Sequence, residues 1–258
     1  MSLLAVNELT KHFGGVKALE GVTFAVSQGE ITGLIGPNGA GKTTCFNLIS
    51  GLLPPTRGGV SLAGEELRRL PPYHRARRGL ARTFQNIQLF GGMTVLGNVL
   101  TGCHLRQEVG PFAAFWPGAA VRRAEAQSRA RALELLELVG LAGRGNLPAE
   151  TLAYGEQRRL EIARALAQEP RLLLLDEPAA GLNSKETEDL MALLEELQAR
   201  GLTLLIIEHD MTLIMGLCQQ VVVLDHGQVI AAGPPAEIRR NPLVIEAYLG
   251  REEEDGDP

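Results

Sequence analysis

The 258-residue chain contains few aromatic residues, few lysines and few cysteines. Aromatic residues make up 4% of the chain and hydrophobic residues 45%, so a globular core would be built mainly from aliphatic side chains. The three cysteines are widely spaced and odd in number, which argues against a disulfide framework or a cysteine metal site. They are typical of small core residues in a reducing compartment.

The sequence also lacks membrane-spanning segments and an overall basic character. No apolar run approaches the roughly 20 residues that cross a bilayer as a helix, and the first residues lack the basic region of a signal peptide. The net charge of −5 argues against nucleic acid as a partner, because phosphate contacts need a basic face. We therefore expect a cytoplasmic α/β protein with one large domain.

Strand-like and helix-like segments alternate near both ends of the chain, which predicts a mainly parallel sheet. Strands are expected at 3–9, 16–19, 22–26, 31–35, 80–84, 172–175, 203–207, 221–224 and 229–231. Helices are expected at 42–50, 95–103, 119–139, 156–167 and 184–200. Helical spacing dominates from about 86 to 168, so this block is predicted to be a subdomain inserted into a domain of residues 1–250. The acidic segment 251–258 is expected to be disordered.

The nine residues after the strand predicted at 31–35 match the P-loop pattern G-x-x-x-x-G-K-[ST]. They are Gly36, Pro37, Asn38, Gly39, Ala40, Gly41, Lys42, Thr43 and Thr44. The glycines let backbone N–H groups point at phosphate oxygens, and the following helix adds a favourable dipole. Lys42, one of four lysines in the chain, would reach the β- and γ-phosphates, and the Thr43 hydroxyl would ligate Mg²⁺. The sequence therefore predicts a site for ATP and magnesium.

Two adjacent carboxylates, Asp176 and Glu177, follow the apolar strand predicted at 172–175. They lie at the carboxyl end of a buried strand, where open α/β sheets bind their ligands. The alternative interpretation is an exposed pair at a strand end. The P-loop elsewhere in the chain favours the ligand site.

Upstream of this strand, residues 152–166 begin as a polar, glycine-containing turn and continue as an apolar-periodic helix. This order of motifs resembles the P-loop, signature sequence and Walker B strand of ATP-binding cassette (ABC) ATPases. The resemblance implies an α/β P-loop NTPase fold with an N-terminal antiparallel β subdomain, a mainly parallel core sheet and an inserted helical subdomain. It also implies a head-to-tail dimer in which each ATP lies between one P-loop and the signature of the other subunit. The signature residues that contact ATP in trans would be Leu152, Ala153, Tyr154, Gly155 and Glu156.

The resemblance also implies roles for five residues outside the P-loop. Asp176 would hold Mg²⁺ directly or through water, and Glu177 would polarise the attacking water. Gln85 would sense Mg²⁺ and water, His209 would contact the γ-phosphate, and Phe13 would stack on adenine. Taken alone, Gln85 would be interpreted as structural and His209 as a solvated or satisfied residue, and the alternative for Phe13 is a core aromatic of an edge strand. The implied catalytic residues are Lys42, Gln85, Glu177 and His209, and the implied metal ligands are Thr43, Gln85 and Asp176.

Four further segments are similar to the larger of two ATP-binding subunits of branched-chain amino-acid importers. These segments are 79–87, 154–161, 177–183 and 246–250, and an aromatic stretch at 110–118 adds to the similarity. The similarity implies a second ATPase subunit (paralogous or identical), two membrane permeases and an extracytoplasmic binding protein, with the chain peripheral at the cytoplasmic face. Other amino acids, urea or lipopolysaccharide remain alternative cargoes. An ABC ATPase that acts on nucleic acid, or a small-molecule kinase, is the alternative outside transport.

Three further features concern the strength of the composite ATP site, the dimer contact and the docking surface. Ala153 stands where the family usually has a serine whose hydroxyl donates to the γ-phosphate, so the composite site that uses this signature is predicted to be weaker. Asn183 is interpreted as a residue that crosses the dimer and, with Glu186 three residues later, as a helix N-cap, and both interpretations can hold. Phe90 and Met93 are interpreted either as a docking surface for a permease or as core of the helical subdomain.

Overall fold

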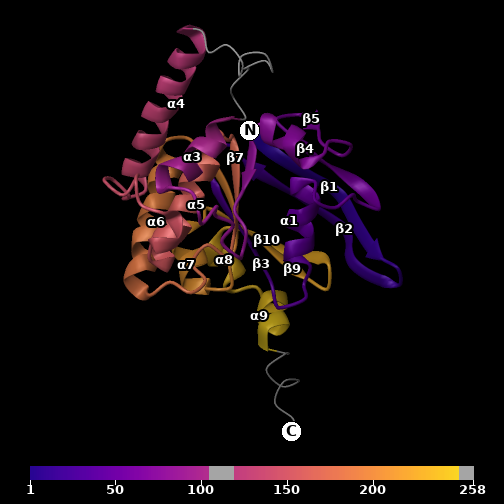
Figure 1. The fold of residues 1–258 in the computed structure, drawn as a ribbon. Helices are drawn as coiled ribbons and strands as arrows, with labels where there is room; N and C mark the ends of the chain where they lie inside the picture. Colours follow the sequence, from indigo (N-terminus) through magenta and orange to yellow (C-terminus); the bar gives the residue numbers. More distant parts are fainter. Residues whose placement is uncertain (105–118, 250–258) are drawn as a thin grey trace.

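The computed structural model describes residues 1–104 and 119–249 (Figure 1). The predictions for the aromatic stretch 110–118 and for the acidic segment 251–258 lie outside these described residues. Across the two described ranges, no helix is long and apolar enough to cross a membrane.

A mainly parallel sheet forms the centre of the described structure, as predicted. Its six strands lie in the order β10-β9-β3-β8-β7-β6. They are β3 (Ile31–Ile35), β6 (Leu80–Arg82), β7 (Leu172–Asp176), β8 (Thr203–Ile207), β9 (Gln220–Asp225) and β10 (Gln228–Gly233). Neighbouring strands pair in parallel, except that β10 runs antiparallel to β9. The parallel strands therefore bring their carboxyl ends, and the residues that follow them, to one edge of the sheet.

Both faces of this sheet are covered at its centre, so the neighbouring strands β7 and β8 are fully buried and consist almost entirely of apolar residues. Leu173 and Leu175 of β7 pack into a core cluster with the helical side of the protein. Leu172 and Leu174 point the other way, into a second cluster with α1 (Lys42–Ser50) and the N-terminal strands. Figure 1 shows α1 between the core sheet and the N-terminal strands, with α3 to α6 on the far side.

The helices between β6 and β7 in chain order form the helical insertion. They are α3 (Val95–Cys103), α4 (Ala119–Leu138), the 3₁₀ turn η3 (Ala149–Thr151) and α5 (Tyr154–Leu166). The remaining helices are α2 (Pro72–Arg77), α6 (Ser184–Ala199), α7 (Met211–Leu217), α8 (Pro235–Ile238) and α9 (Pro242–Leu249). At the start of α6 the Asn183 side chain accepts from the Glu186 N–H, and the Glu186 carboxylate accepts from the Asn183 N–H, both at 3.0 Å. The N-cap interpretation of Asn183 is therefore confirmed.

An antiparallel sheet in the order β2-β1-β4-β5 forms the N-terminal part. Its strands are β1 (Ser2–Phe13), β2 (Val16–Ser27), β4 (Arg57–Leu62) and β5 (Glu65–Glu66). The predicted break between strands at 16–19 and 22–26 is wrong. Gly21, with φ of +66°, lies at an irregularity within a continuous β2, and its N–H donates to the Thr10 hydroxyl at 3.0 Å. The glycine that suggested a turn is a bulge residue.

Candidate nucleotide site

The P-loop connects the end of β3 to the start of α1. The α1 helix begins at Lys42. The Lys42 ammonium group donates to the carbonyl oxygen of Gly36 and to that of Pro37, the latter at 3.0 Å. The Lys42 side chain is thereby fixed across the loop with only 9% of the residue exposed. A preorganised cation beside a helix N-terminus is suited to phosphate oxygens.

Close packing explains the glycines at the two ends of the P-loop. A Cβ atom at Gly36 would collide with the carbonyl oxygen of Leu224 in β9. A Cβ atom at Gly41 would lie 2.6 Å from a methyl group of Leu19 and 2.7 Å from the carbonyl oxygen of Ala18. Both glycines also have positive φ angles, +148° and +101°. The loop can approach β9 and β2 only with glycine at these positions.

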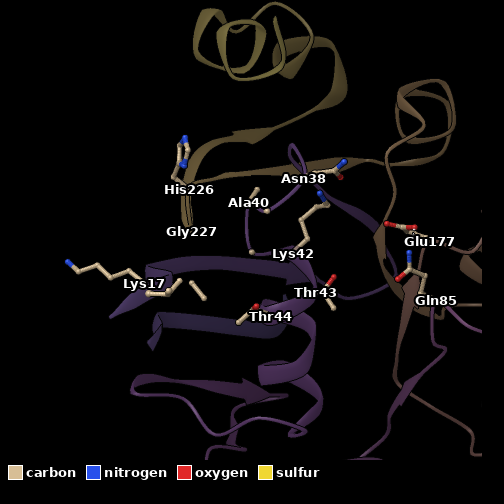
Figure 2. Close-up of a pocket in the computed structure, with 14 residues that line it drawn as sticks. Lys17, Asn38, Ala40, Lys42, Thr43, Thr44, Gln85, Glu177, His226 and Gly227 are labelled. Carbon is tan, nitrogen blue, oxygen red and sulfur yellow. Dashed lines mark hydrogen bonds between the residues drawn. The ribbon is translucent and has the colours of Figure 1, made fainter. Parts of the chain in front are cut away.

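A cavity of about 480 Å³ opens in front of the P-loop (Figure 2). The loop and the start of α1 line one wall with residues 38–44, and Gln85 and Glu177 lie across from them. The lining also includes residues from β2 and from the turn between β9 and β10, namely Val16, Lys17, Ala18, His226 and Gly227. The cavity therefore combines a phosphate-binding loop with a carboxylate and an amide.

Gln85 and Glu177 contact each other directly in this cavity. The side-chain amide of Gln85 donates to the Glu177 carboxylate at 2.9 Å. The N–H of Glu177 donates to the carbonyl oxygen of Ile207 at 2.9 Å, and Glu177 has a φ of +47°. Non-glycine residues with positive φ are uncommon, and strained ones cluster at functional sites. The backbone contact and the amide together fix the carboxylate opposite the P-loop.

Asp176, the last residue of β7, directly precedes Glu177 but does not line the cavity. It is paired with Arg82 of β6. The Arg82 guanidinium donates to the Asp176 carboxylate at 2.9 Å, and both side chains are 6% exposed. Arg82 also donates to Asn47 at 2.8 Å and to Ser50 at 2.9 Å, both on α1. Because one Asp176 oxygen accepts from Arg82, we expect Asp176 to act on a metal through its other oxygen or through water.

The oxygen donors near the P-loop suit a magnesium ion. Mg²⁺ prefers hydroxyl, amide and carboxylate oxygens together with water. Thr43 and Gln85 line the cavity, and Asp176 ends the strand directly before Glu177. The three predicted ligands therefore have the right chemistry, supplied by three different parts of the chain.

His209 and Phe13 lie outside the cavity lining. His209 follows β8, its side chain is 67% exposed, and its Nδ1 is 3.8 Å from the Glu208 carboxylate. Phe13 ends β1 opposite Val16, which does line the cavity, and the Lys11 ammonium lies 5.0 Å from the Phe13 ring centre. The contacts predicted for His209 and Phe13 with ATP stay predictions.

The signature residues form a separate surface at the start of α5. Ala153 occupies the N-cap position with extended backbone, and its N–H donates to the Glu156 carboxylate at 3.1 Å. The Ala153 methyl group cannot accept a hydrogen bond from a backbone N–H of the first turn of the helix. Only half of a capping box is therefore present. Residues 152–156 are absent from the cavity lining, and their contact with the ATP of a second subunit stays a prediction.

The comparisons with known proteins agree with this geometry. A family model described as ABC transporter matches residues 19–180, which is more than half of the chain. The chain belongs to the ABC transporter family. A second model, described as branched-chain amino acid ATP-binding cassette transporter, matches residues 228–254.

Several curated proteins are similar to this ABC cassette over almost its whole length. It is 47% identical over 249 residues to the high-affinity branched-chain amino acid transport ATP-binding protein BraF of Pseudomonas aeruginosa, which covers 96% of this chain and 98% of that protein. The identity and both coverages are the same for the high-affinity branched-chain amino acid transport ATP-binding protein LivG of Escherichia coli. The lipopolysaccharide export system ATP-binding protein LptB of Haemophilus influenzae is 34% identical over 253 residues, 98% of this chain and 99% of that one.

Solved ATP-binding cassettes show the same fold. The ADP conformation of one cassette matches with a TM-score of 0.85 and 33% identity, over 97% of this chain and 99% of that one. A dimeric cassette in a post-hydrolysis state, bound to ADP and Pi, matches with a TM-score of 0.76 and 28% identity, over 90% and 99% of the two chains. The predicted P-loop NTPase fold is therefore confirmed.

The turn between β9 and β10 lines the cassette's cavity and is not predicted from the sequence as part of the site. His226 and Gly227 form the turn between β9 and β10, with φ angles of +43° and +76°. The Gly227 N–H donates to the Ala40 carbonyl oxygen at 3.1 Å, and its own carbonyl accepts from the Glu20 N–H at 2.9 Å. This turn ties the P-loop to β2. The sequence carries a turn signal here, but nothing local shows that the turn reaches the P-loop.

Glu208, directly after β8, accepts hydrogen bonds from two backbone segments near the site. Its carboxylate accepts from the Ala179 N–H at 2.8 Å and from the His209 N–H at 3.2 Å. Burial raises the pKa of Glu208, and the two backbone N–H donors and His209 partly offset that rise, whereas Glu177 adds to it. Glu208 thus connects the segments that follow β7 and β8.

Proposed function

We propose that this cassette binds and hydrolyses ATP with Mg²⁺ as one of the two ATPase subunits of an importer for branched-chain amino acids. The cavity in which the P-loop faces the hydrogen-bonded pair Gln85 and Glu177 carries the proposal of hydrolysis. The similarity to BraF and LivG and the family match at 228–254 support the cargo. The chain would act peripherally at the cytoplasmic face of the membrane.

Binding of the triphosphate would rest on residues 36–44. Their backbone N–H groups, the start of α1 and the Lys42 ammonium form a positive environment for phosphate oxygens. A bound Mg²⁺, held by Thr43, Gln85 and Asp176, would neutralise charge on the β- and γ-phosphates. In this proposal Phe13 stacks on the adenine at the edge of the cavity next to Val16.

Activation of water is assigned to Glu177. A carboxylate opposite the phosphate loop can accept a proton from, or orient, a water molecule that attacks the γ-phosphate. The Gln85 amide holds this carboxylate at 2.9 Å and so limits its rotation. His209 would donate a hydrogen bond to the γ-phosphate from the end of β8.

The partner subunit would complete the site with its signature residues. Because residues 152–156 of this chain lie away from its own cavity, they are available to the nucleotide of a second cassette. The N-terminus of α5, where Ala153 and Tyr154 are exposed, can direct backbone N–H groups and the helix dipole at a γ-phosphate. With alanine at position 153, this signature offers one hydrogen bond fewer than a serine would, which makes the two sites of a heterodimer unequal.

Phe90, Met93 and Leu147 are proposed as the docking surface for the permeases. They are 53%, 40% and 38% exposed, so the alternative that Phe90 and Met93 belong to the subdomain core is wrong. The Phe90 backbone is nevertheless rigid: its N–H donates to the buried Asn98 side chain at 2.9 Å, and its carbonyl accepts from the same side chain at 3.1 Å. A fixed backbone that presents exposed apolar groups suits a protein interface.

Reconstitution tests this proposal. The cassette, a paralogous ATPase subunit and two permeases would be placed in liposomes with binding protein loaded with leucine, isoleucine or valine. We expect these ligands to stimulate ATP hydrolysis and uptake. Stimulation by urea or lipopolysaccharide alone would overturn the cargo and leave the ATPase assignment intact. Stimulation by DNA without permeases would overturn the importer itself.

A further inference from the structure

Two ionisable side chains of α5 are buried inside the protein, although neither belongs to the catalytic set. The Arg158 and Glu161 side chains are 0% and 2% exposed, and they form an ion pair at 3.2 Å. Burying two charges is costly unless further hydrogen bonds satisfy them. Their other partners therefore indicate what the pair does.

Arg158 binds the segment that carries the catalytic glutamine. Its Nη1 donates to the Phe84 carbonyl at 2.8 Å and its Nη2 donates to the Gln85 carbonyl at 2.9 Å. Glu161 faces the same segment and accepts from the N–H groups of Phe84 and Gln88, both at 3.4 Å. One helix thus holds residues 84–88 by donors and acceptors together.

Arg158 also binds the signature. The same Nη2 donates to the Tyr154 hydroxyl at 3.1 Å, and the guanidinium carbon lies 5.8 Å from the centre of the Tyr154 ring. The Tyr154 ring also packs on Gly181, where a Cβ atom would lie 3.0 Å from the ring. Gly181 belongs to the loop after Glu177, and Glu177 accepts from Gln85. The contacts form a closed circuit through Glu177, Gln85, Arg158, Tyr154 and Gly181.

We propose that Arg158 is a positioning residue that couples the two ATP sites of the dimer. It fixes the backbone of Gln85, which serves the chain's own site, to Tyr154, which serves the partner's site. A movement of the signature against the partner's nucleotide is thereby transmitted to Gln85 and to the Glu177 carboxylate. The proposal rests on the proposed dimeric ATPase, but the circuit of contacts lies within one chain.

The planar fork of arginine is required for this role. One guanidinium donates to two neighbouring carbonyls and a phenol at once, and a lysine ammonium on a flexible stem cannot reproduce that geometry. Arg158→Lys keeps the charge beside Glu161 but loses the fork. Arg159→Lys is the matched control, because Arg159 is the next residue on α5 and takes no part in the circuit.

Hydrogen exchange of the isolated subunit tests the coupling without any need for a partner. In Arg158→Lys we expect the amides of residues 85–88 and 154–157 to exchange about tenfold faster, with no such change in Arg159→Lys. Tyr154→Phe removes only the hydroxyl and should accelerate exchange at residues 85–88 by about twofold or more. If Arg158→Lys does not fold, the double variant Arg158→Met/Glu161→Met replaces it, because removing both charges leaves neither unpaired. Hydrogen exchange at residues 85–88 and 154–157 is then measured in that variant.

Hydrolysis by the reconstituted complex supplies the second readout. We expect Arg158→Lys to lower kcat about tenfold or more while the Kd of the isolated subunit for MgATP stays within about threefold. Unchanged exchange at residues 85–88 in both Arg158→Lys and Tyr154→Phe would overturn the coupling. A wild-type complex without ATPase activity would instead overturn the proposed function, and the exchange result would still stand.

Discussion

Arg82 and Asp176 are 94 residues apart in the sequence and form a buried ion pair of 2.9 Å that lies outside the lining of the nucleotide cavity. The pair joins the ends of β6 and β7. Arg82 also donates hydrogen bonds to Asn47 and Ser50 of α1. It therefore ties the P-loop helix to the strand that ends in the two carboxylates.

Removal of one partner of this pair should be strongly destabilising. Arg82→Met would leave Asp176 buried without its counter-charge, and we expect the free energy of unfolding to fall by about 3–5 kcal/mol. Lys185→Met is the control, because the Lys185–Asp189 pair is exposed on α6 and should contribute little to the free energy of unfolding. Urea unfolding of the isolated subunit measures both values. Equal losses in the two variants would contradict the structural role of the buried pair.

Ala153→Ser should have two separate effects. The serine hydroxyl can accept from the first turn of α5 and complete the capping box with Glu156, which should stabilise the isolated subunit by about 0.5–2 kcal/mol. A hydrogen bond from the same hydroxyl to the partner's ATP would add about 1.5–3 kcal/mol at the composite site. Thermal unfolding without nucleotide measures the first effect, and ATP affinity and turnover of the assembled heterodimer measure the second.

The two measurements separate the explanations. Greater stability with unchanged ATP affinity and turnover would show that position 153 acts only as a helix cap. The prediction of unequal ATP sites would then be wrong.

Much of this site was predictable from the sequence because its signals are local. The P-loop is one contiguous motif, and the strand before it and the helix after it occur at the predicted residues. The site at Asp176 and Glu177 is predicted from their place after a buried strand, whereas the role of Gln85 comes from the family resemblance. The contact between Gln85 and Glu177 follows from pairing of β6 with β7, in which Arg82 aligns with Leu174. Parallel neighbours necessarily bring the residues after them to one edge.

The remaining parts depend on contacts between distant segments. The pair of Arg82 with Asp176 and the approach of His226 and Gly227 to the cavity have no local signal, because neither follows from periodicity or turn chemistry. The bulge at Gly21 was mistaken for a turn, since a glycine between apolar segments fits both. Strand β6 ends at Arg82 and not at residue 84, because the Phe84 backbone is bound by Arg158 and Glu161.

The pH dependence of stability should reflect Glu208. Burial raises its pKa in the folded protein above the ordinary value of 4.5, so the folded state binds this proton more tightly than the unfolded chain. The stability that Glu208 contributes is therefore present below the ordinary pKa and is lost as the pH rises through the folded-state pKa. Glu208→Gln keeps an acceptor for the Ala179 N–H without the charge. We expect its stability relative to wild type to increase as the pH rises above about 4.5.

Chemical denaturation at a series of pH values measures this difference. Glu195→Gln on the exposed side of α6 is the matched control for the loss of one exposed carboxylate. A Glu208→Gln difference that shrinks as the pH rises would contradict the burial argument.

Phe90→Asp should disrupt permease docking without unfolding the cassette. Because Phe90 is 53% exposed, the change should alter the free energy of unfolding by less than about 1 kcal/mol. An unpaired carboxylate in an apolar interface should weaken the affinity for detergent-solubilised permeases by about tenfold or more. Tyr73→Asp, at an aromatic residue of α2 that is 58% exposed, is the control and should bind normally. Normal binding and transport by Phe90→Asp would exclude this surface as the docking site.

The most direct measurement of the central claim compares MgATP binding with ATP turnover in Glu177→Gln, within the reconstituted complex. Glutamine keeps the shape of the side chain beside Gln85 but removes the carboxylate that would act on water. We expect kcat to fall about 10²-fold or more while the Kd for MgATP stays within about threefold of wild type. Retained turnover, or a loss of nucleotide binding as large as the loss of turnover, would contradict the assignment of Glu177 as the residue that activates water in this cavity.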